Sequence, residues 1–247
     1  MTLQHQTALI SGGGGGVGKA IARALVDLGI RVALMGRDQE RLARTKAELA
    51  VADDLVLLAP CDVTDRAQLS TAVDAVLTQL GSLDILVCGA GINVQKRSLR
   101  SIDPADWDKI IATNLTGAFN LVHAVLPHMR ERGQGLVIQL GSLSGMRVNT
   151  LSGVGYSVSK FGQAALGISI GREERGRSIR STVLYAGEIN TPLLDARGAR
   201  PGGGEDTRRQ NILQPEDVGA AVRFLAELPP RVHIPELVIK PTIDDFF

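Results

Sequence analysis

The run that decides the fold is Ser11-Gly12-Gly13-Gly14-Gly15-Gly16-Val17-Gly18-Lys19. It comes directly after the apolar residues 7–10 and directly before a helix-like pattern over residues 20–28. A strand, a glycine turn and a helix in succession present bare backbone N–H groups and the positive end of a helix, and both attract phosphate. The run therefore predicts a nucleotide-binding site.

Two kinds of nucleotide site each fit this run in part. Gly13, Gly18 and Lys19 satisfy most of the G-x-x-x-x-G-K-[ST] phosphate loop of nucleoside triphosphatases, but the next residue is Ala20, whose methyl group cannot ligate magnesium. The glycines at positions 12, 16 and 18 depart from the strict G-x-G-x-x-G spacing of dinucleotide sites. The glycine run alone leaves both kinds of site open.

The composition predicts a globular protein with one sizeable core, because 44% of the 247 residues are hydrophobic and 21% are charged. The 27 basic and 26 acidic residues give a formal charge of +1 and form no basic stretch, so we expect no nucleic-acid partner. We expect a cytoplasmic protein without a membrane span, because the N-terminus lacks signal features and no apolar run reaches about 18 residues. Cys61 and Cys88 end apolar runs, which predicts core thiols and neither a disulfide nor a metal site.

Short runs of Val, Ile and Leu alternate with longer amphipathic segments, which is typical of a parallel sheet covered by helices. We expect strands at residues 7–11, 31–36, 55–60, 84–88, 135–140, 180–186 and 236–239. We expect helices at residues 16–28, 39–50, 65–80, 104–132, 155–175 and 215–228, with Asp65, Asp103 and Pro215 near helix starts. The pattern predicts one α/β domain over residues 1–247, built on a doubly wound sheet of about seven strands with helices on both faces.

Residues 187–214 break this rhythm, because they hold Asp195, several arginines and the glycine run 202–204. The segment is too long and polar for a plain connector, and in a doubly wound sheet it would lie over the carboxyl ends of the strands. We interpret it as a substrate lid. The alternative is a disordered excursion without a role.

Tyr156 and Lys160 lie four residues apart at the start of a helix-like segment, so they share one helix face. A lysine cation near a tyrosine favours the phenolate and lowers the pKa of such a phenol from about 10. The pair could then exchange a proton with a carbonyl oxygen or an alcohol as hydride moves. Ser142 follows an apolar strand and could hold the substrate oxygen. Asn114 lies mid-helix, where either an ordered water on a proton path or a solvated surface amide would explain it.

These residues resemble the motifs of the short-chain dehydrogenase/reductase family, and the likeness covers nearly the whole chain. The T-G-x-x-x-G-x-G loop of the family corresponds to residues 11–18, and its Y-x-x-x-K motif corresponds to Tyr156 and Lys160. Its catalytic serine corresponds to Ser142 and its helix asparagine to Asn114. The resemblance resolves the glycine run in favour of a nicotinamide dinucleotide and is closest in kind to 3-oxoacyl-[acyl-carrier-protein] reductases.

The resemblance implies a Rossmann-type fold and hydride transfer at a ketone or secondary alcohol, with Tyr156 as acid or base. Lys160 would also bind the ribose hydroxyls, and Asn114 would link it through water to solvent. The implied cofactor contacts are Ser11, Gly12, Gly16, Val17, Gly18, Arg37, Asp62, Val63, Ala90, Gly91, Tyr156, Lys160, Gly187, Ile189 and Thr191.

The chain departs from the family pattern at three places. The N-N-A-G motif reads Cys88-Gly89-Ala90-Gly91, so both asparagines that would brace the sheet are missing. The proline-glycine pair reads Ala186-Gly187, which loosens the turn that carries Ile189 and Thr191. The first residue of the glycine motif is Ser11 instead of threonine, which retains the hydroxyl.

The cofactor preference rests on Arg37. An NAD enzyme of this architecture usually ends its second strand with a carboxylate for the ribose 2′-hydroxyl, whereas this chain has Gly36-Arg37 there. A guanidinium offers a charged fork to a 2′-phosphate. We therefore expect NADP(H), and NAD(H) remains the alternative because Asp38 lies next door.

Lys96, Arg97, Arg147 and the arginines of the insert could collect an anionic or acyl-linked substrate, or they could be ordinary surface cations. The resemblance implies a homotetramer or a homodimer. Small residues at 162, 164, 165 and 167 would permit close helix packing between subunits, and the Phe246-Phe247 tail could meet a neighbouring chain. The functional alternatives are an NAD-dependent alcohol dehydrogenase of the same family, a non-catalytic dinucleotide sensor and a phosphate-loop triphosphatase.

Overall fold

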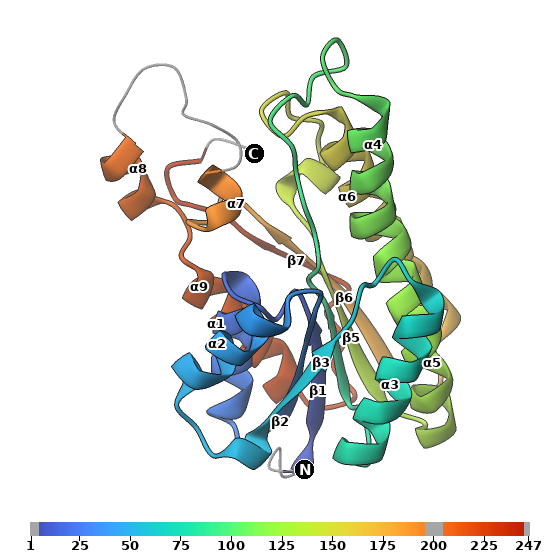
Figure 1. The fold of residues 1–247 in the computed structure, drawn as a ribbon. Helices are drawn as coiled ribbons and strands as arrows, with labels where there is room; N and C mark the ends of the chain where they lie inside the picture. The colour runs from blue at the N-terminus through green and yellow to red at the C-terminus, as the bar shows by residue number, and fades with distance from the viewer. Residues whose placement is uncertain (1–4, 196–204, 245–247) are drawn as a thin grey trace.

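The computed structural model describes residues 5–195 and 205–244, which form one seven-stranded parallel sheet between two layers of helices (Figure 1). The strand order is β3-β2-β1-β4-β5-β6-β7. The strands are β1 (Thr7–Ser11), β2 (Arg31–Gly36), β3 (Val56–Pro60), β4 (Ile85–Cys88), β5 (Gly135–Leu140), β6 (Ile179–Ala186) and β7 (Glu236–Ile239). This arrangement confirms the predicted doubly wound, Rossmann-type sheet.

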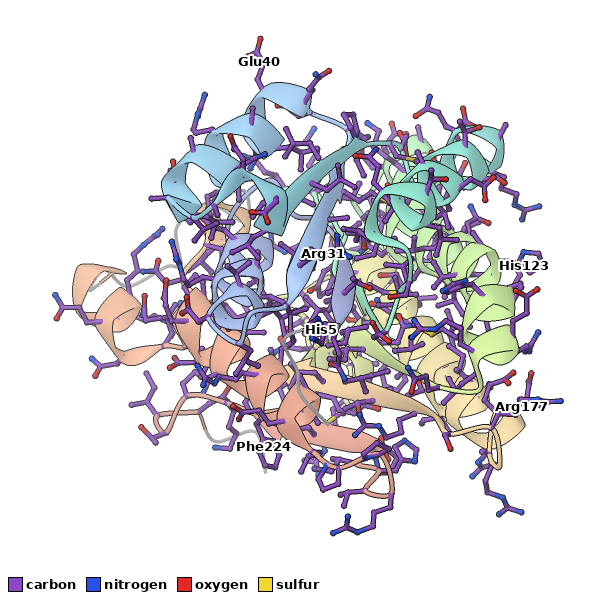
Figure 2. All side chains as sticks on the ribbon, turned by 90° about the horizontal axis from the view of Figure 1, so that it is seen from below. His5, Arg31, Glu40, His123, Arg177 and Phe224 are labelled. Carbon is purple, nitrogen blue, oxygen red and sulfur yellow. The ribbon has the colours of Figure 1, made fainter. Side chains whose placement is uncertain are left out.

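Helices cover both faces of the sheet, which is evident when the molecule is seen from below (Figure 2). One layer contains α1 (Val17–Val26), α2 (Gln39–Leu49) and α9 (Pro215–Glu227), and the other contains α3 (Arg66–Leu80), α5 (Gly117–Arg132) and α6 (Val154–Glu173). The remaining helices are α4 (Pro104–Ile111), α7 (Pro192–Asp195) and α8 (Glu205–Asn211).

The apolar runs form strands because each strand side chain meets one of two cores. In β1, Leu9 belongs to the core beneath α3 and α5, whereas Ala8 and Ile10 belong to the core beneath α1 and α9. A central parallel strand is covered on both faces, so its sequence is continuously apolar rather than alternating. This is why residues 7–10 contain no charged side chain.

Aspartates begin several helices, as the sequence predicts for Asp65 and Asp103. Asp65 accepts hydrogen bonds from the N–H groups of Ala67 and Gln68 at the start of α3, and Asp103 accepts from Ala105 at the start of α4. Asp38 caps α2 in the same way. These carboxylates satisfy N–H groups that the first helical turn leaves without a backbone partner.

The helix expected over residues 104–132 is interrupted by a π-helical turn at Ala112–Thr116, between α4 and α5. An extra residue in one turn shifts the side chains that follow, and such turns recur at functional sites. The segment Pro104–Arg132 is long and apolar enough to cross a membrane, but half of its most apolar stretch is buried inside the protein. We interpret it as a core helix.

The two cysteines and two glycines of α6 pack inside the protein. Cys61 and Cys88 are free thiols buried in the core, and burial raises the pKa of Cys61 to about 11 and that of Cys88 to about 12. Among the small residues of α6, Gly162 packs against Leu115 in the π-helical turn and Gly167 packs against Val183 on β6, both inside the same subunit, whereas Ala165 is exposed.

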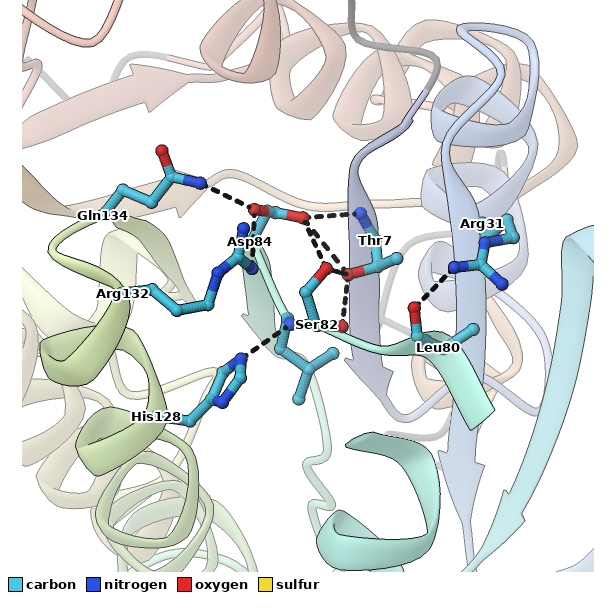
Figure 3. Close-up of polar contacts among 9 residues, drawn as sticks. Thr7, Arg31, Leu80, Ser82, Asp84, His128, Arg132 and Gln134 are labelled. Atoms are coloured by element: carbon cyan, nitrogen blue, oxygen red, sulfur yellow. Dashed lines mark hydrogen bonds and ion pairs between the residues drawn. The ribbon is translucent and has the colours of Figure 1, made fainter. Parts of the chain in front are cut away.

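A polar cluster joins the elements at the amino ends of the strands (Figure 3). The Asp84 carboxylate accepts from the Thr7 backbone N–H at 3.0 Å and from Gln134 Nε2 at 3.2 Å, and it lies 3.1 Å from Arg132. His128 on α5 accepts from the Leu83 N–H at 3.2 Å. The cluster fastens β1, α5 and the start of β5 to the segment that enters β4.

Replacing Asp84 by Ala is expected to lower the free energy of unfolding by about 2–4 kcal/mol, because it leaves a partly buried guanidinium and a buried N–H without an acceptor. Chemical denaturation measures the loss. The matched control is Asp54→Ala, which removes an exposed carboxylate and should change stability by about 0.5 kcal/mol or less. Equal effects of the two substitutions would contradict a structural role for the cluster.

Candidate active site

The strand order reverses at β1. Strands β2 and β3 lie on one side of it, and strands β4 to β7 lie on the other side. Loops that leave neighbouring strands in opposite directions open a crevice, and doubly wound sheets bind ligands there. A cavity of about 340 Å³ occupies this position. The predicted cofactor residues that line it are Gly12, Gly16, Val17, Gly18, Arg37, Asp62, Val63, Ala90, Gly91 and Thr191.

Glycines bring three backbone segments together beside this cavity. Gly12 has a φ of +77°, and a Cβ on it would lie 2.8 Å from the carbonyl oxygen of Gly89 after β4. A Cβ on Gly18 would overlap the carbonyl oxygen of Gly12. Helix α1 begins at Val17 with no acidic residue in its first turn, so its N-terminal N–H groups favour an anion. The cradle therefore fits a pyrophosphate.

Ser11 is buried and braces the cavity from behind instead of lining it. Its Oγ accepts from the N–H groups of Gly89 at 3.0 Å and Ala90 at 3.2 Å, and it donates to the Val87 carbonyl at 3.3 Å. The hydroxyl thus fixes the loop after β4 to the end of β1. This is a physical reason for a hydroxyl at the first position of the glycine motif.

Lys19 has the geometry of a surface residue. Its Nζ lies 2.7 Å from Glu48 on α2, and this pairing lowers the pKa of that carboxyl. A phosphate-loop lysine must instead reach the bound phosphates. Together with the buried methyl of Ala20, this placement removes support from the triphosphatase alternative.

One end of the cavity carries two guanidinium groups. Arg37 follows β2 and lies 3.9 Å from the carboxylate of Asp62, which follows β3. Arg41, on the first turn of α2, lies over the glycine loop, with its guanidinium 3.8 Å from the position of a Cβ on Gly15. The sequence analysis did not include Arg41, which lies three residues after the helix-capping Asp38.

Tyr156 and Lys160 lie on consecutive turns of α6, and only 7% and 5% of their surfaces are exposed. The Lys160 Nζ is 5.7 Å from the centre of the Tyr156 ring. The same Nζ is 4.0 Å from the position of a Cβ on Gly91, which lines the cavity. The lysine therefore lies directly behind the inner wall of the cavity, within Coulombic range of the phenol.

The ammonium of Lys160 has two neutral acceptors. It donates to the Leu140 carbonyl at 2.6 Å and to Gln163 Oε1 at 2.7 Å. Burial lowers the pKa of Lys160, because a charged group loses its hydration there. Hydrogen bonds to the charged form oppose this effect.

Asn114 lies in the π-helical turn and is fully buried, so the solvated-amide explanation is wrong. Its Oδ1 accepts from the Ile92 N–H at 2.8 Å, and its Nδ2 donates to the Ile92 carbonyl at 3.0 Å. Asn114 Nδ2 also donates to Ser159 Oγ on α6 at 3.1 Å. The amide thus pairs with the backbone of the loop after β4 and ties this loop to the helix that carries Tyr156.

Ser142 lines a second cavity, of about 280 Å³, two residues beyond the end of β5. Its Oγ accepts from the Ser144 N–H at 3.2 Å, which starts a short 3-10 turn at Leu143–Gly145. The other polar residues of this lining include Asn149, Glu188 and Arg208. The lining also contains Gly187, so the loop after β6 borders this cavity.

The residues after β6 are divided between the two cavities. Thr191 lines the first cavity next to Gly16, and Gly187 lines the second. Ile189 is partly buried against the core beneath α1 and forms an isolated bridge with Leu213. Residues 196–204, with Arg197 and Arg200, lie outside the described residues, as do Phe246 and Phe247.

Most candidate anion-collecting cations of the described chain lie outside the two cavities. Arg97 donates to the carbonyl of Leu151 and braces a loop, and neither Lys96 nor Arg147 lines either cavity. Arg208 lines the second cavity, where it forms an ion pair with Glu188. The charge that Arg208 brings to the cavity is therefore already balanced.

Comparisons with known proteins agree with this geometry. A family model for short chain dehydrogenases matches residues 6–201. An uncharacterized oxidoreductase of Staphylococcus saprophyticus is 28% identical over 97% of this chain and 98% of its own length. A glycine betaine reductase of Emericella nidulans is 32% identical over 97% of this chain, which covers 19% of that longer protein.

Solved structures give the same result. Levodione reductase is 30% identical with a TM-score of 0.86 over 96% of both chains. An alcohol dehydrogenase from Thermococcus sibiricus, complexed with 5-hydroxy-NADP, is 28% identical with a TM-score of 0.83 over 97% of both chains. A 3-ketoacyl-(acyl-carrier-protein) reductase from Brucella melitensis, complexed with NADH, is 25% identical with a TM-score of 0.85 over 95% of this chain and 96% of its own. The chain therefore belongs to the short-chain dehydrogenase family, as an oxidoreductase with an NAD(P)-binding Rossmann fold.

Proposed function

We propose that the protein is an NADP(H)-dependent oxidoreductase that interconverts a ketone and a secondary alcohol. The observation that carries this proposal is the position of Gly91, which lines the dinucleotide cavity and lies in front of the Lys160 ammonium. A buried ammonium directly behind the wall of a dinucleotide cavity, 5.7 Å from the centre of a buried phenol ring, is suited to support proton transfer beside a nicotinamide. A protein that only senses a dinucleotide has no need for such a pair.

Tyr156 supplies the proton in this reaction. The bound dinucleotide supplies the hydride in the reductive direction and accepts it in the oxidative direction. As hydride reaches the carbonyl carbon, Tyr156 donates its phenol proton to the carbonyl oxygen, and the product is a secondary alcohol. Lys160 stabilises the resulting phenolate through its positive charge. Ser142 holds the substrate oxygen, and Asn114 keeps the loop after β4 against α6.

The two guanidinium groups support NADP(H) over NAD(H). Arg37 and Arg41 both line the cavity at the end of β2, and a 2′-phosphate there would accept charge-assisted hydrogen bonds from them. The contact of Arg37 with Asp62 competes with such a phosphate and favours NAD(H) as the second candidate. Asp38 is engaged as a helix cap through its contact with the Arg41 N–H.

The second cavity supports a small polar substrate. Its described lining combines hydroxyl, amide and ion-paired side chains with apolar ones such as Leu143 and Ile212, and most of its exposed surface is polar, which gives a long acyl chain little apolar surface to bury. We propose that residues 187–214 act as the substrate-covering segment, because the described residues at both ends of it border the cavities.

We propose a homotetramer or a homodimer that assembles through α5 and α6. Phe119, Val158 and Phe161 expose between 41% and 44% of their surfaces on these helices. Exposed large apolar side chains on neighbouring helices are typical of interfaces between subunits.

Replacing Tyr156 by Phe is expected to lower kcat by about 10²–10⁴-fold, because the ring remains while the transferable proton is lost. Steady-state kinetics with NADPH and NADH over a panel of hydroxyketones, simple ketones and 3-oxoacyl thioesters measures this loss. Cofactor affinity should change by less than about threefold, which fluorescence titration checks. A wild-type protein without turnover across the panel would contradict the proposed enzyme and favour the sensor.

Replacing Arg37 by Ala is expected to weaken NADPH binding about 10- to 100-fold, which corresponds to the loss of a hydrogen bond to a charged group. NADH affinity should stay within about threefold, because NADH lacks the 2′-phosphate. Arg41→Ala should act in the same direction. Arg44→Ala is the matched control, since Arg44 is exposed on the same helix and does not line the cavity. Equal losses for both dinucleotides would contradict recognition of the 2′-phosphate.

A further inference from the structure

We propose that Gln163 is a positioning residue for Lys160, which holds the ammonium charged and in place behind the cofactor cavity. The inference rests on the proposed function, because it concerns the group that acts on Tyr156. It draws on buried hydrogen bonds through which Gln163 and Gln139 join α6, β4 and β5.

Gln163 and Lys160 form a direct hydrogen bond between buried side chains. Gln163 follows Lys160 by three residues on α6, is completely buried and accepts from its Nζ at 2.7 Å. An ammonium can only donate, so the Gln163 amide must turn its oxygen toward Lys160. This fixes the direction of the amide.

The amide nitrogen of Gln163 is held on the opposite side. It donates to the Cys88 carbonyl at the end of β4 at 3.2 Å and to Gln139 Oε1 on β5 at 3.1 Å. The Cys88 carbonyl can only accept, so this contact holds the amide against a flip that would place an N–H group against the ammonium. The contact with Gln139 adds a second acceptor on the same side.

Gln163 also contacts the strand end at which the motif Cys88-Gly89 departs from the family pattern. The family pattern has asparagine side chains at these two positions to brace the sheet, and this chain has neither. The Gln163 amide reaches the same strand end from α6 and binds the Cys88 carbonyl. The helix that carries Tyr156 and Lys160 thus adds one contact to a strand end that Ser11 also braces.

The charge state of Lys160 depends on these contacts. Burial lowers the pKa of Lys160, whereas the titratable groups that act on it, Tyr156 on its own helix and Cys88 on β4, favour the cation. Burial raises the pKa of the Cys88 thiol to about 12, so this thiol remains neutral at ordinary pH. The Leu140 carbonyl and Gln163 Oε1 are then the fixed acceptors that stabilise the ammonium in the described structure.

The test follows the phenolate of Tyr156 directly, by ultraviolet absorbance during an alkaline titration of the full-length protein. The chain has two tyrosines, Tyr156 and Tyr185. Burial and the hydrogen bond to Glu236 raise the pKa of Tyr185 far above its ordinary value, so this residue stays silent. Tyr156→Phe should remove the absorbance step and thereby assign it.

Gln163→Met keeps the side-chain length and removes both the acceptor and the donor. The expected result is a shift of the titration midpoint to higher pH by about half a unit or more, because a destabilised ammonium loses its proton and no longer favours the phenolate. The acidic limb of kcat/KM for alcohol oxidation should move by the same amount and in the same direction. A purely structural role would lower activity or stability without moving either midpoint.

Gln139→Met is the matched control, because it removes one contact of the Gln163 amide and leaves the Lys160 acceptor in place. The midpoint of its Tyr156 titration should stay within about 0.2 pH units of that of the wild type, although its thermal stability falls. If Gln163→Met does not fold, Gln163→Asn, which withdraws the amide by one methylene group, should shift the midpoint in the same direction.

Three results would overturn the inference: equal midpoints in the wild type and a folded Gln163 variant, an equal shift in Gln139→Met, or a wild type without a Tyr156-dependent step while it remains folded. The titration needs neither substrate nor turnover. A failure of the proposed function, which would be seen as absent turnover in the wild type, is therefore distinguishable from a failure of this inference.

Discussion

The close approach of backbone segments at the carboxyl end of β1 is the constraint on which the rest of the site depends. Gly12 contacts the loop after β4, and Gly18 places the first turn of α1 against Gly12, with no room for a Cβ at either position. Because Ser11 fixes the loop after β4 to the same point, the positions of α1 and of this loop are set together. The N–H groups at the start of α1 and the inner wall at Gly91 are thereby parts of one rigid unit.

The two edges of the sheet use buried polar groups in different ways. At the amino ends of the strands, Asp84 satisfies several donors and is itself paired with Arg132, so the cluster contributes to holding the strands together. At the carboxyl ends, Lys160 is a buried cation whose fixed acceptors are neutral. Among the described residues no carboxylate pairs with Lys160, and a cation without a counter-ion is costly to bury. In the proposed reaction, this uncompensated charge would stabilise the phenolate that forms on Tyr156.

The strands and most helices could be predicted from the sequence because a doubly covered parallel sheet requires continuous apolar runs. Residues 7–11, 31–36 and 135–140 form strands with the expected limits. The chain alone could not place Arg41, because its position over the glycine loop depends on the angle at which α2 leaves β2. The π-helical turn was also beyond prediction, because a single inserted residue does not change the apolar pattern of residues 104–132.

Gln139 is a sequence signal for the buried polar network beside Lys160. The strand Gly-Leu-Val-Ile-Gln-Leu is buried on both faces, and a glutamine within it violates the pattern that predicts the strand. An amide cannot be buried there without polar neighbours, since an unpaired polar group costs about 1–3 kcal/mol. The side-chain oxygen of Gln139 accepts from Gln163, which lies three residues after the motif lysine on the covering helix. A polar residue inside an otherwise apolar strand is therefore evidence for a buried network at the end of that strand, where parallel sheets place their chemistry.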